Sequence, residues 1–332
     1  MTTFFPHLYE YSKFISLAKE YEKIDEHQTQ IQRKRHFADS KYAEQKPIKY
    51  LTLSKNTLSF NQCRQSSDID FLIYLEIKAQ KLRESSYNPL KYYNVSINEI
   101  LKERTELANF NRYQKPADWP QSSSIIHISE YKHKCFSTSR HWMIIDFILC
   151  VEIAKILPFF DKLNIDDKQE LLKSTTLLNS LFTQAYYSFT VSCDALIFPD
   201  GSVPCMFTQK HNIQSGFFEE IVEPIKRIKM TKEEYVLLKT MIFCSSKSEF
   251  ISVEGSKIIE SEFHRYSKLL LNFLQAKYGD SEGAVRYSQI LSVLEAMIYF
   301  TQKAKEFYFY VGTLNTNFRQ HSTFALVKQL IN

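Results

Sequence analysis

The chain has 332 residues, 44% of them hydrophobic, and a net charge of +5. That length suffices for one large domain with an extension, or for two small domains. Only 6 glycines and 9 prolines are present, which argues against a turn-rich β-sandwich, a barrel or a glycine-loop nucleotide enzyme. The weak positive charge is compatible with a nuclear protein but does not by itself indicate nucleic-acid binding. The composition therefore predicts a mostly helical protein.

The six cysteines are far apart in the sequence and form no C-x-x-C pair. Several of them lie within apolar runs, which is typical of buried thiols in a reducing compartment. No apolar run reaches the roughly 18 residues needed to cross a membrane, and the first residues lack the basic start and apolar centre of a signal peptide. Neither a membrane span nor a secretory leader is expected.

Residues 1–67 differ from the rest of the chain in their pattern of apolar and charged residues. They are predicted to form an N-terminal, hinge-like extension that is partly helical. Apolar residues between Phe14 and Ile31 recur at helical spacing among many charges. The triplet Arg33-Lys34-Arg35 is either a solvated helix face or a nuclear-import element. Residues 36–65 are expected to be a connector, with a short strand near Tyr50–Leu53.

From Asp68 the helical periodicity is clearer, and it predicts a helix that ends before Tyr87-Asn88-Pro89. Ser96 with Glu99 three residues later forms a capping box, which predicts a second helix to about Leu107. A loop over residues 109–130 follows, and then a long helix over roughly 131–157.

A sharp break comes at Pro158, which cannot donate a backbone N–H and restricts the residue before it. Asp166 and Asp167 suit the start of the next helix, where carboxylates meet unpaired N–H groups. Two helices joined by such a bend should enclose a groove, and Lys155 and Lys173 would flank it.

The next segment, 175–191, is apolar nearly all round and predicts a helix buried in the middle of the domain. Ala195–Phe198, the turn Pro199-Asp200-Gly201 and Val203–Phe207 predict a small hairpin. Further helices are expected near residues 216–227, 231–243 with a Thr231/Glu234 capping box, 254–278, 282–311 and 324–331.

The residues around the bend closely resemble the signature of nuclear-receptor ligand-binding domains. The matching positions are Ala154, Lys155, Pro158, Phe160, Leu163, Asp167, Leu171, Leu172 and Lys173, while Lys168 replaces the usual glutamine. The segment before Pro89 resembles the large nematode, hepatocyte-nuclear-factor-like branch. The resemblance implies an all-α fold over residues 68–332. This fold would be a three-layer antiparallel sandwich of about eleven to twelve helices with one small β-hairpin.

The resemblance also implies a groove for partner helices that carry the LxxLL motif, closed by the C-terminal activation helix. The family's lysine and glutamate hold the two ends of such a partner helix; here Gln329 replaces the glutamate. The expected groove residues are Val151, Lys155, Ile165, Gln169, Leu172, Lys173, Leu326, Gln329 and Leu330. Core packing is the alternative for Val151 and Leu172, and a solvated lysine is the alternative for Lys155.

A pocket for a lipophilic small molecule is implied by the same helices. Its expected lining is Ser139, Trp142, Met143, Asp146, Leu177, Leu181, Gln184, Tyr187, Phe198 and Met206. Tyr187 stands where fatty-acid receptors place an arginine, so no cation is evident and neutral lipids are expected to bind better than free acids. Alternatively, the protein's own aromatic rings fill the pocket.

The family forms dimers through the helix that corresponds to residues 282–311. The expected contacts are Tyr287, Ile290, Leu291 and Leu294, which have helical spacing. The alternative is that all four face the core. A homodimer and a heterodimer with another nuclear receptor are both compatible with this pattern.

No catalytic or cofactor motif is recognisable, so an enzyme is not expected. His127, His133, Cys135 and His141 do not follow a usual zinc spacing. Without paired C-x-x-C zinc motifs, this chain alone is not expected to bind DNA. Three hypotheses remain: a ligand-responsive regulator in the nucleus, a ligand-independent dimerisation module of the same fold, and an unrelated helical protein.

Overall fold

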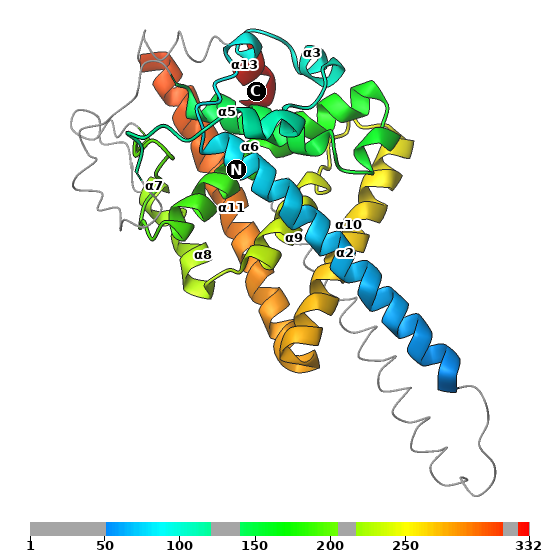
Figure 1. Ribbon diagram of the computed structural model, residues 1–332. Coiled ribbons are helices and arrows are strands. Elements are labelled where there is room, and N and C mark those ends of the chain that lie inside the picture. Colours follow the sequence, from blue (N-terminus) through cyan, green and yellow to red (C-terminus); the bar gives the residue numbers. More distant parts are fainter. Residues whose placement is uncertain (1–50, 121–139, 205–216, 315–324, 332) are drawn as a thin grey trace, which may run out of the picture. The chain divides into compact units, whose positions relative to one another are not determined.

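The computed structural model describes residues 51–120, 140–204, 217–314 and 325–331 (Figure 1). The chain divides into two compact units, Met1–Asn61 and Gln62–Asn332, and the fold described below is that of the second. The expected helix near Phe14–Ile31 and the basic triplet lie outside the described residues. The expected boundary between residues 67 and 68 stays a prediction.

Helices account for the regular structure of the described residues, which agrees with the expected all-α fold. They are α2 (Leu51–Arg83), α3 (Ile97–Lys102), α5 (Trp142–Ala154), α6 (Ile165–Thr190), α7 (Phe217–Glu220), α8 (Glu223–Ile228), α9 (Lys232–Phe243), α10 (Val253–Tyr278), α11 (Asp280–Leu314) and α13 (Ala325–Ile331). Short 3₁₀ turns span Leu90–Tyr92, Glu106–Arg112 and Phe160–Lys162. None of the described helices is long and apolar enough to span a membrane.

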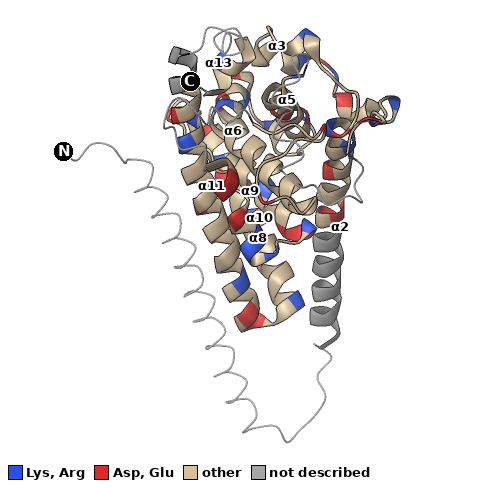
Figure 2. Cartoon of the chain, turned by 90° about the vertical axis from the view of Figure 1, so that its left-hand side faces the viewer, with Lys and Arg blue, Asp and Glu red and all other residues tan. Residues whose placement is uncertain are grey.

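Helix α6 is at the centre of the domain and packs against α5, α9, α11 and α13. α9 packs in turn against α10, and α10 against α11, which places α6 and α9 between outer helices (Figure 1). Helix α5 is covered on all sides, because nearly every residue from Trp142 to Ala154 is buried. In Figure 2 the positive and negative residues are interspersed along the helices rather than gathered into one patch.

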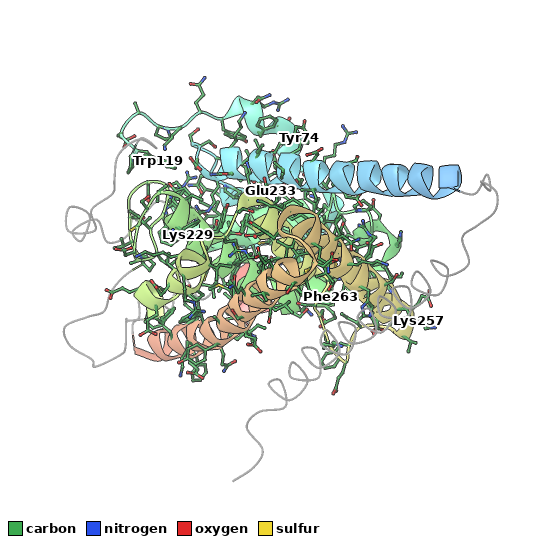
Figure 3. All side chains as sticks on the ribbon, turned by 90° about the horizontal axis from the view of Figure 1, so that it is seen from below. Tyr74, Trp119, Lys229, Glu233, Lys257 and Phe263 are labelled. Atoms are coloured by element: carbon green, nitrogen blue, oxygen red, sulfur yellow. The ribbon has the colours of Figure 1, made fainter. Side chains whose placement is uncertain are left out.

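Buried ion pairs tie α2 to this core. Arg83 at the end of α2 contacts Asp146 of α5, and Glu76 contacts Lys239 of α9 at 2.9 Å. The outer side of α2 is solvated, as Tyr74 is 56% exposed (Figure 3). Burying a charge is costly unless it is paired, so these pairs fix where α2 lies against α5 and α9.

Two glycines shape the connection between α10 and α11. Gly279 has a φ of +90°, a conformation that L side chains rarely adopt. A Cβ on Gly283 would lie 2.6 Å from the Gln275 Cα. The absence of a side chain at Gly283 therefore allows the two long helices to approach closely where they meet.

Several predicted elements are confirmed and several boundaries are wrong. Both capping boxes form, at Ser96/Glu99 and at Thr231/Glu234. The strand expected near Tyr50–Leu53 is wrong, because helix α2 already begins at Leu51.

Three predicted helices are shorter or divided. The helix from Ser96 ends at Lys102 rather than Leu107, and a 3₁₀ turn follows. The expected helix 131–157 is not continuous, because His141 is an N-cap residue and the helix begins at Trp142. The helix expected over 216–227 is two short helices, with Pro224 in the first turn of the second.

The hairpin around Pro199-Asp200-Gly201 is tested only in its turn. The Phe198 N–H donates to the Ser202 carbonyl at 2.8 Å, and the Gly201 N–H donates to the Phe198 carbonyl at 2.9 Å. Gly201 has a φ of +80°, which suits a glycine in a tight turn. The described part of this segment forms no regular strand, and residues 205–207 lie outside it, so the hairpin itself stays a prediction.

Candidate functional site

The bend between α5 and α6 forms as the sequence predicts. Lys155 is the C-cap residue of α5, and the apolar residues of the turn, including Phe160 and Leu163, are buried. Asn164 caps α6, its side chain accepting a hydrogen bond from the Asp167 N–H at 2.8 Å. The helix begins at Ile165, so Asp166 and Asp167 lie in its first turn, where the sequence predicted carboxylates at the start of the helix.

Lys155 is held by two groups at this bend rather than solvated. Its Nζ lies 2.8 Å from Glu152 Oε1 and donates to the Ile100 carbonyl at 3.2 Å. Its side chain is only 10% exposed, and Glu152 is fully buried. The other oxygen of Glu152 accepts from the Glu106 N–H at 2.6 Å. The ammonium group of Lys155 therefore lies at the end of α5 and contacts α3.

Helix α13 packs against α6 with its apolar face. Leu326, Val327 and Leu330 are each 4% exposed or less. Gln329 is half-buried, and its Oε1 accepts a hydrogen bond from the Ile97 N–H at 3.1 Å. Figure 1 shows α13 and α3 at the same end of the domain, next to α5 and α6. The two residues expected to hold the ends of a partner helix therefore both contact α3.

The other expected groove residues differ in exposure. Val151 and Leu172 are fully buried, as the core-packing alternative has it. Ile165 is 43% exposed, and Gln169 is half-buried. Lys173 pairs with Glu170 of the same helix at 2.6 Å. Ile165 and Gln169 thus supply the accessible surface, while Val151 and Leu172 support it from beneath.

Ile97 and Ile100 belong to this site, but sequence reasoning did not find them. Both side chains are fully buried, and both backbones bind a groove residue. The available signal was their spacing within a capped helix. That signal does not show which distant residues they contact.

The expected pocket contains a buried polar cluster at its centre. Arg83 Nε donates to Asp146 Oδ1 at 2.6 Å, and Gln184 Nε2 donates to Asp146 Oδ2 at 2.9 Å. Burial by itself lowers the pKa of Arg83, but the Asp146 carboxylate more than offsets this and raises it above its ordinary value. Arg83 of α2 thus brings a cation to this region, although none was evident from the residues of α5 and α6.

Aromatic rings occupy the side of the pocket next to the turn at residue 200. Trp142 and Phe198 are stacked, with ring centroids 5.6 Å apart. The guanidinium of Arg140 lies 4.4 Å from the centroid of the Trp142 ring, and burial lowers its pKa to about 10. Arg140 donates to the Ser85 carbonyl at 2.9 Å, yet its Nε has no hydrogen-bond partner among the described residues. A second cation thus lies in a largely aromatic environment.

A cavity of about 220 Å³ lies between α2, α5, α6 and α9. Asp146 and Tyr187, both expected pocket residues, contribute to its lining. On the α9 side, Lys239 pairs with Glu76, and the Tyr235 hydroxyl donates to Glu76 at 3.1 Å. The lining of this cavity therefore combines apolar side chains with two buried ion pairs, Arg83 with Asp146 and Lys239 with Glu76.

The remaining expected pocket residues are buried or lie outside the described residues. Leu177, Leu181 and Gln184 are each 4% exposed or less, and Met143 is half-buried. Ser139 and Met206 lie outside the described residues. Whether a ligand or the protein's own rings fill this region stays a prediction.

The expected dimer contacts face mainly inward. Tyr287, Ile290 and Leu294 are each 5% exposed or less, whereas Leu291 is half-buried. The three buried side chains pack in the domain itself, which is the alternative that the sequence left open. The exposed large residues of α11 are instead Val285, Tyr299 and Phe309.

The side chains that the structure describes form neither a metal-binding site nor a site with an accessible cysteine. No cluster of three or more His, Cys, Asp or Glu side chains there could hold a metal ion. His127, His133 and Cys135 lie outside that part. Cys150, Cys193 and Cys244 are buried thiols, and burial raises the pKa of Cys150 to about 11.

The fold and the bend place the chain in a known class of proteins. Residues 127–314 match the family described as the ligand-binding domain of nuclear hormone receptor. The chain belongs to this family, whose members are ligand-regulated transcription factors and not enzymes.

Curated relatives come from Caenorhabditis elegans. The chain is 25% identical to nuclear hormone receptor family member nhr-60 over 241 residues, which are 69% of this chain and 53% of that protein. It is 23% identical to family member nhr-153 over 270 residues, which are 80% of this chain and 64% of the relative. The match to family member nhr-154 is 24% over 266 residues, 76% of this chain and 54% of that protein. The chain thus spans about half to two thirds of these relatives.

Proposed function

We propose that this domain regulates transcription in the nucleus by recruiting short amphipathic helices of the LxxLL type. The observation that carries the proposal is the pair formed by Lys155 and Gln329, each bonded to one end of the same short helix. An ammonium group favours the carbonyl end of a helix, and an acceptor favours its N–H end. Exposed Ile165 and half-buried Gln169 offer surface near α13 for such a partner.

The ligand that would regulate this recruitment is proposed to be a lipophilic small molecule with a polar group. The support is the position of Arg140, which lies over the Trp142 ring and whose Nε has no partner in the part of the chain that the structure describes. A buried donor without a partner carries a desolvation cost of roughly 1–3 kcal/mol. A ligand that supplies an acceptor would remove this cost.

The second candidate function is a ligand-independent dimerisation module of the same fold. The stacking of Trp142 on Phe198 favours it, because these rings fill space that a ligand would otherwise use. A homodimer or a heterodimer with another nuclear receptor would then use the exposed side of α11. DNA binding by this chain alone is not proposed.

Titration with a labelled LxxLL peptide tests the proposal. The control is the same peptide with its three leucines changed to alanine, because this control leaves the protein unaltered. We expect the leucine peptide to bind more tightly, and a photo-cross-linker on it to label α5, α6 and α13. Equal binding of both peptides, or labelling confined to other helices, would contradict the proposed groove.

A further inference from the structure

A short helix of this chain lies across the groove itself. The Ile100 carbonyl, in the last turn of α3, accepts a hydrogen bond from Lys155 at 3.2 Å. The Ile97 N–H, at the first residue of α3, donates to Gln329 at 3.1 Å. Both hydrogen-bonding groups proposed for a partner helix are therefore already used by α3, in the same orientation.

The sequence of α3 has the spacing of the partner motif. Ile97, Ile100 and Leu101 stand at positions i, i+3 and i+4, the pattern of the three leucines in LxxLL. Such residues share one helical face. Ile97 and Ile100 are fully buried and Leu101 is half-buried, while Glu99 is exposed. The helix therefore presents to the domain the apolar face that a partner helix would present.

The position of α3 agrees with this spacing. α3 packs against α6, the helix against which α13 also packs. Figures 1 and 2 both show α3 and α13 together at one end of the domain. An incoming helix could not bind Lys155 and Gln329 in this way while α3 remains in place.

Apart from the two buried side chains of Ile97 and Ile100, the attachments of α3 are those of a short and exposed segment. The helix has only 6 residues, and isolated helices of that length are unstable in water. The ion pair that joins the two ends of this segment, Lys91 before α3 and Glu103 after it, has side chains 56% and 48% exposed, and exposed pairs contribute little to stability. Local opening of such a segment requires less than global unfolding.

We propose that α3 is an internal competitor that occupies the groove in cis and must be displaced before an LxxLL-type helix binds. The inference rests on the proposed function, because it assigns an occupant to the same groove. Binding of a partner then depends on the fraction of molecules in which α3 has left. Apparent affinity is reduced by that fraction.

The test compares the full chain with the variant Ile97→Ala/Ile100→Ala, in which α3 loses its two buried anchors. A labelled LxxLL peptide should bind this variant at least about tenfold more tightly than wild type, as expected when α3 occupies nine tenths of the grooves. Affinities within about twofold of each other would overturn the inference. Binding itself would in that case still support the proposed function.

Lys155 supplies a second signature of competition. Lys155→Ala weakens the binding of both the partner helix and α3 to the groove. When α3 is otherwise unchanged, the two losses therefore offset each other and the measured peptide affinity hardly changes. In the Ile97→Ala/Ile100→Ala background only the partner is weakened, and we expect about fivefold lower affinity, the equivalent of one hydrogen bond. The same loss in both backgrounds would overturn the inference.

Matched controls separate displacement from general loss of stability. Ile259→Ala removes a buried isoleucine of α10 and should leave peptide affinity unchanged. If the double variant does not fold, Ser96→Ala/Glu99→Ala removes only the capping box of α3. This variant should still raise peptide affinity, and no increase would overturn the inference.

If the LxxLL peptide binds neither the wild-type chain nor the double variant, a peptide of residues 94–105 provides a further test. Added in trans at up to about 1 mM, the range that a tethered segment can reach locally, this peptide should bind the double variant. Lys155→Ala should weaken that binding. Such a result would keep α3 as the occupant while removing LxxLL helices as partners, whereas no binding would overturn both.

Discussion

Gln329 accepts a hydrogen bond from the Ile97 N–H at 3.1 Å, although the two residues are 232 positions apart in the chain. The bond joins the C-terminal helix α13 to the first residue of α3. Since Lys155 binds the other end of α3, the two helices that frame the groove are connected through it. The position of α13 and the occupancy of the groove are therefore coupled.

Gln329→Glu should show this coupling. A carboxylate accepts a stronger hydrogen bond from an N–H than a neutral amide does, by roughly 1 kcal/mol. In a chain with an unchanged α3, the substitution strengthens the binding of α3 and of the partner helix to the groove alike, so the affinity for the LxxLL peptide should hardly change. In the Ile97→Ala/Ile100→Ala background we expect about fivefold tighter binding in a fluorescence titration. A tighter complex in wild type alone would contradict this account.

Asp146 should be among the side chains most important for stability. Asp146→Ala leaves the Arg83 guanidinium buried without its carboxylate and removes the acceptor of Gln184. Breaking a buried pair from one side costs about 3–5 kcal/mol, which urea denaturation measures. Asp161→Ala, on an exposed carboxylate, is the control. A cost for Asp146→Ala below about 1 kcal/mol, the usual limit for an exposed pair, would show that the cluster is not structural.

The third prediction concerns the charge of the ligand that the pocket prefers. Because Arg140 is buried and its Nε has no hydrogen-bond partner among the described residues, a fatty acid should raise the melting temperature more than the matched alcohol, which reverses the order expected from the sequence. Ligands that bind only the folded state stabilise it. Arg140→Gln should remove the difference between acid and alcohol. A larger shift with the alcohol would refute the assignment, and no shift with either would favour a pocket filled by its own rings.

Dimerisation, if it uses α11, should depend on the exposed side of that helix. Tyr299 of α11 is 55% exposed, and Tyr74 of α2 is 56% exposed, so the two form a matched pair. We expect Tyr299→Arg to shift the domain toward monomer in light scattering, because the new charge would be buried in the interface. Tyr74→Arg should have no effect. Equal behaviour of both variants would exclude this interface.

Local sequence signals predicted much of the fold. The capping boxes at Ser96 and Thr231 and the break at Pro158 depend on neighbouring residues, and all three appear as expected. The start of α2 was missed because residues 51–65 lack clear helical periodicity. The start of α5 was placed too early, because α5 begins at Trp142 with His141 as its N-cap residue, and the His141 side chain makes no capping hydrogen bond that a local sequence signal would indicate.

The candidate site was less predictable, because its decisive contacts join distant positions. Lys155 was identified from the motif around the bend, but its bond to Ile100 spans 55 positions. Arg83 reaches Asp146 over 63 positions, so a cation in the pocket could not be inferred from spacing on α5 and α6. Burial of Tyr287 and Ile290 likewise depends on helices that the pattern of α11 does not specify.

Hydrogen–deuterium exchange across α3, measured with and without a saturating LxxLL peptide, tests the central claim most directly. If α3 occupies the groove, the amides of Ile97–Lys102 should be protected in the domain alone and exchange faster once the peptide is bound. The amides around α13 should remain protected, since the peptide replaces α3 there. Unchanged protection of α3 in the presence of bound peptide would contradict the claim.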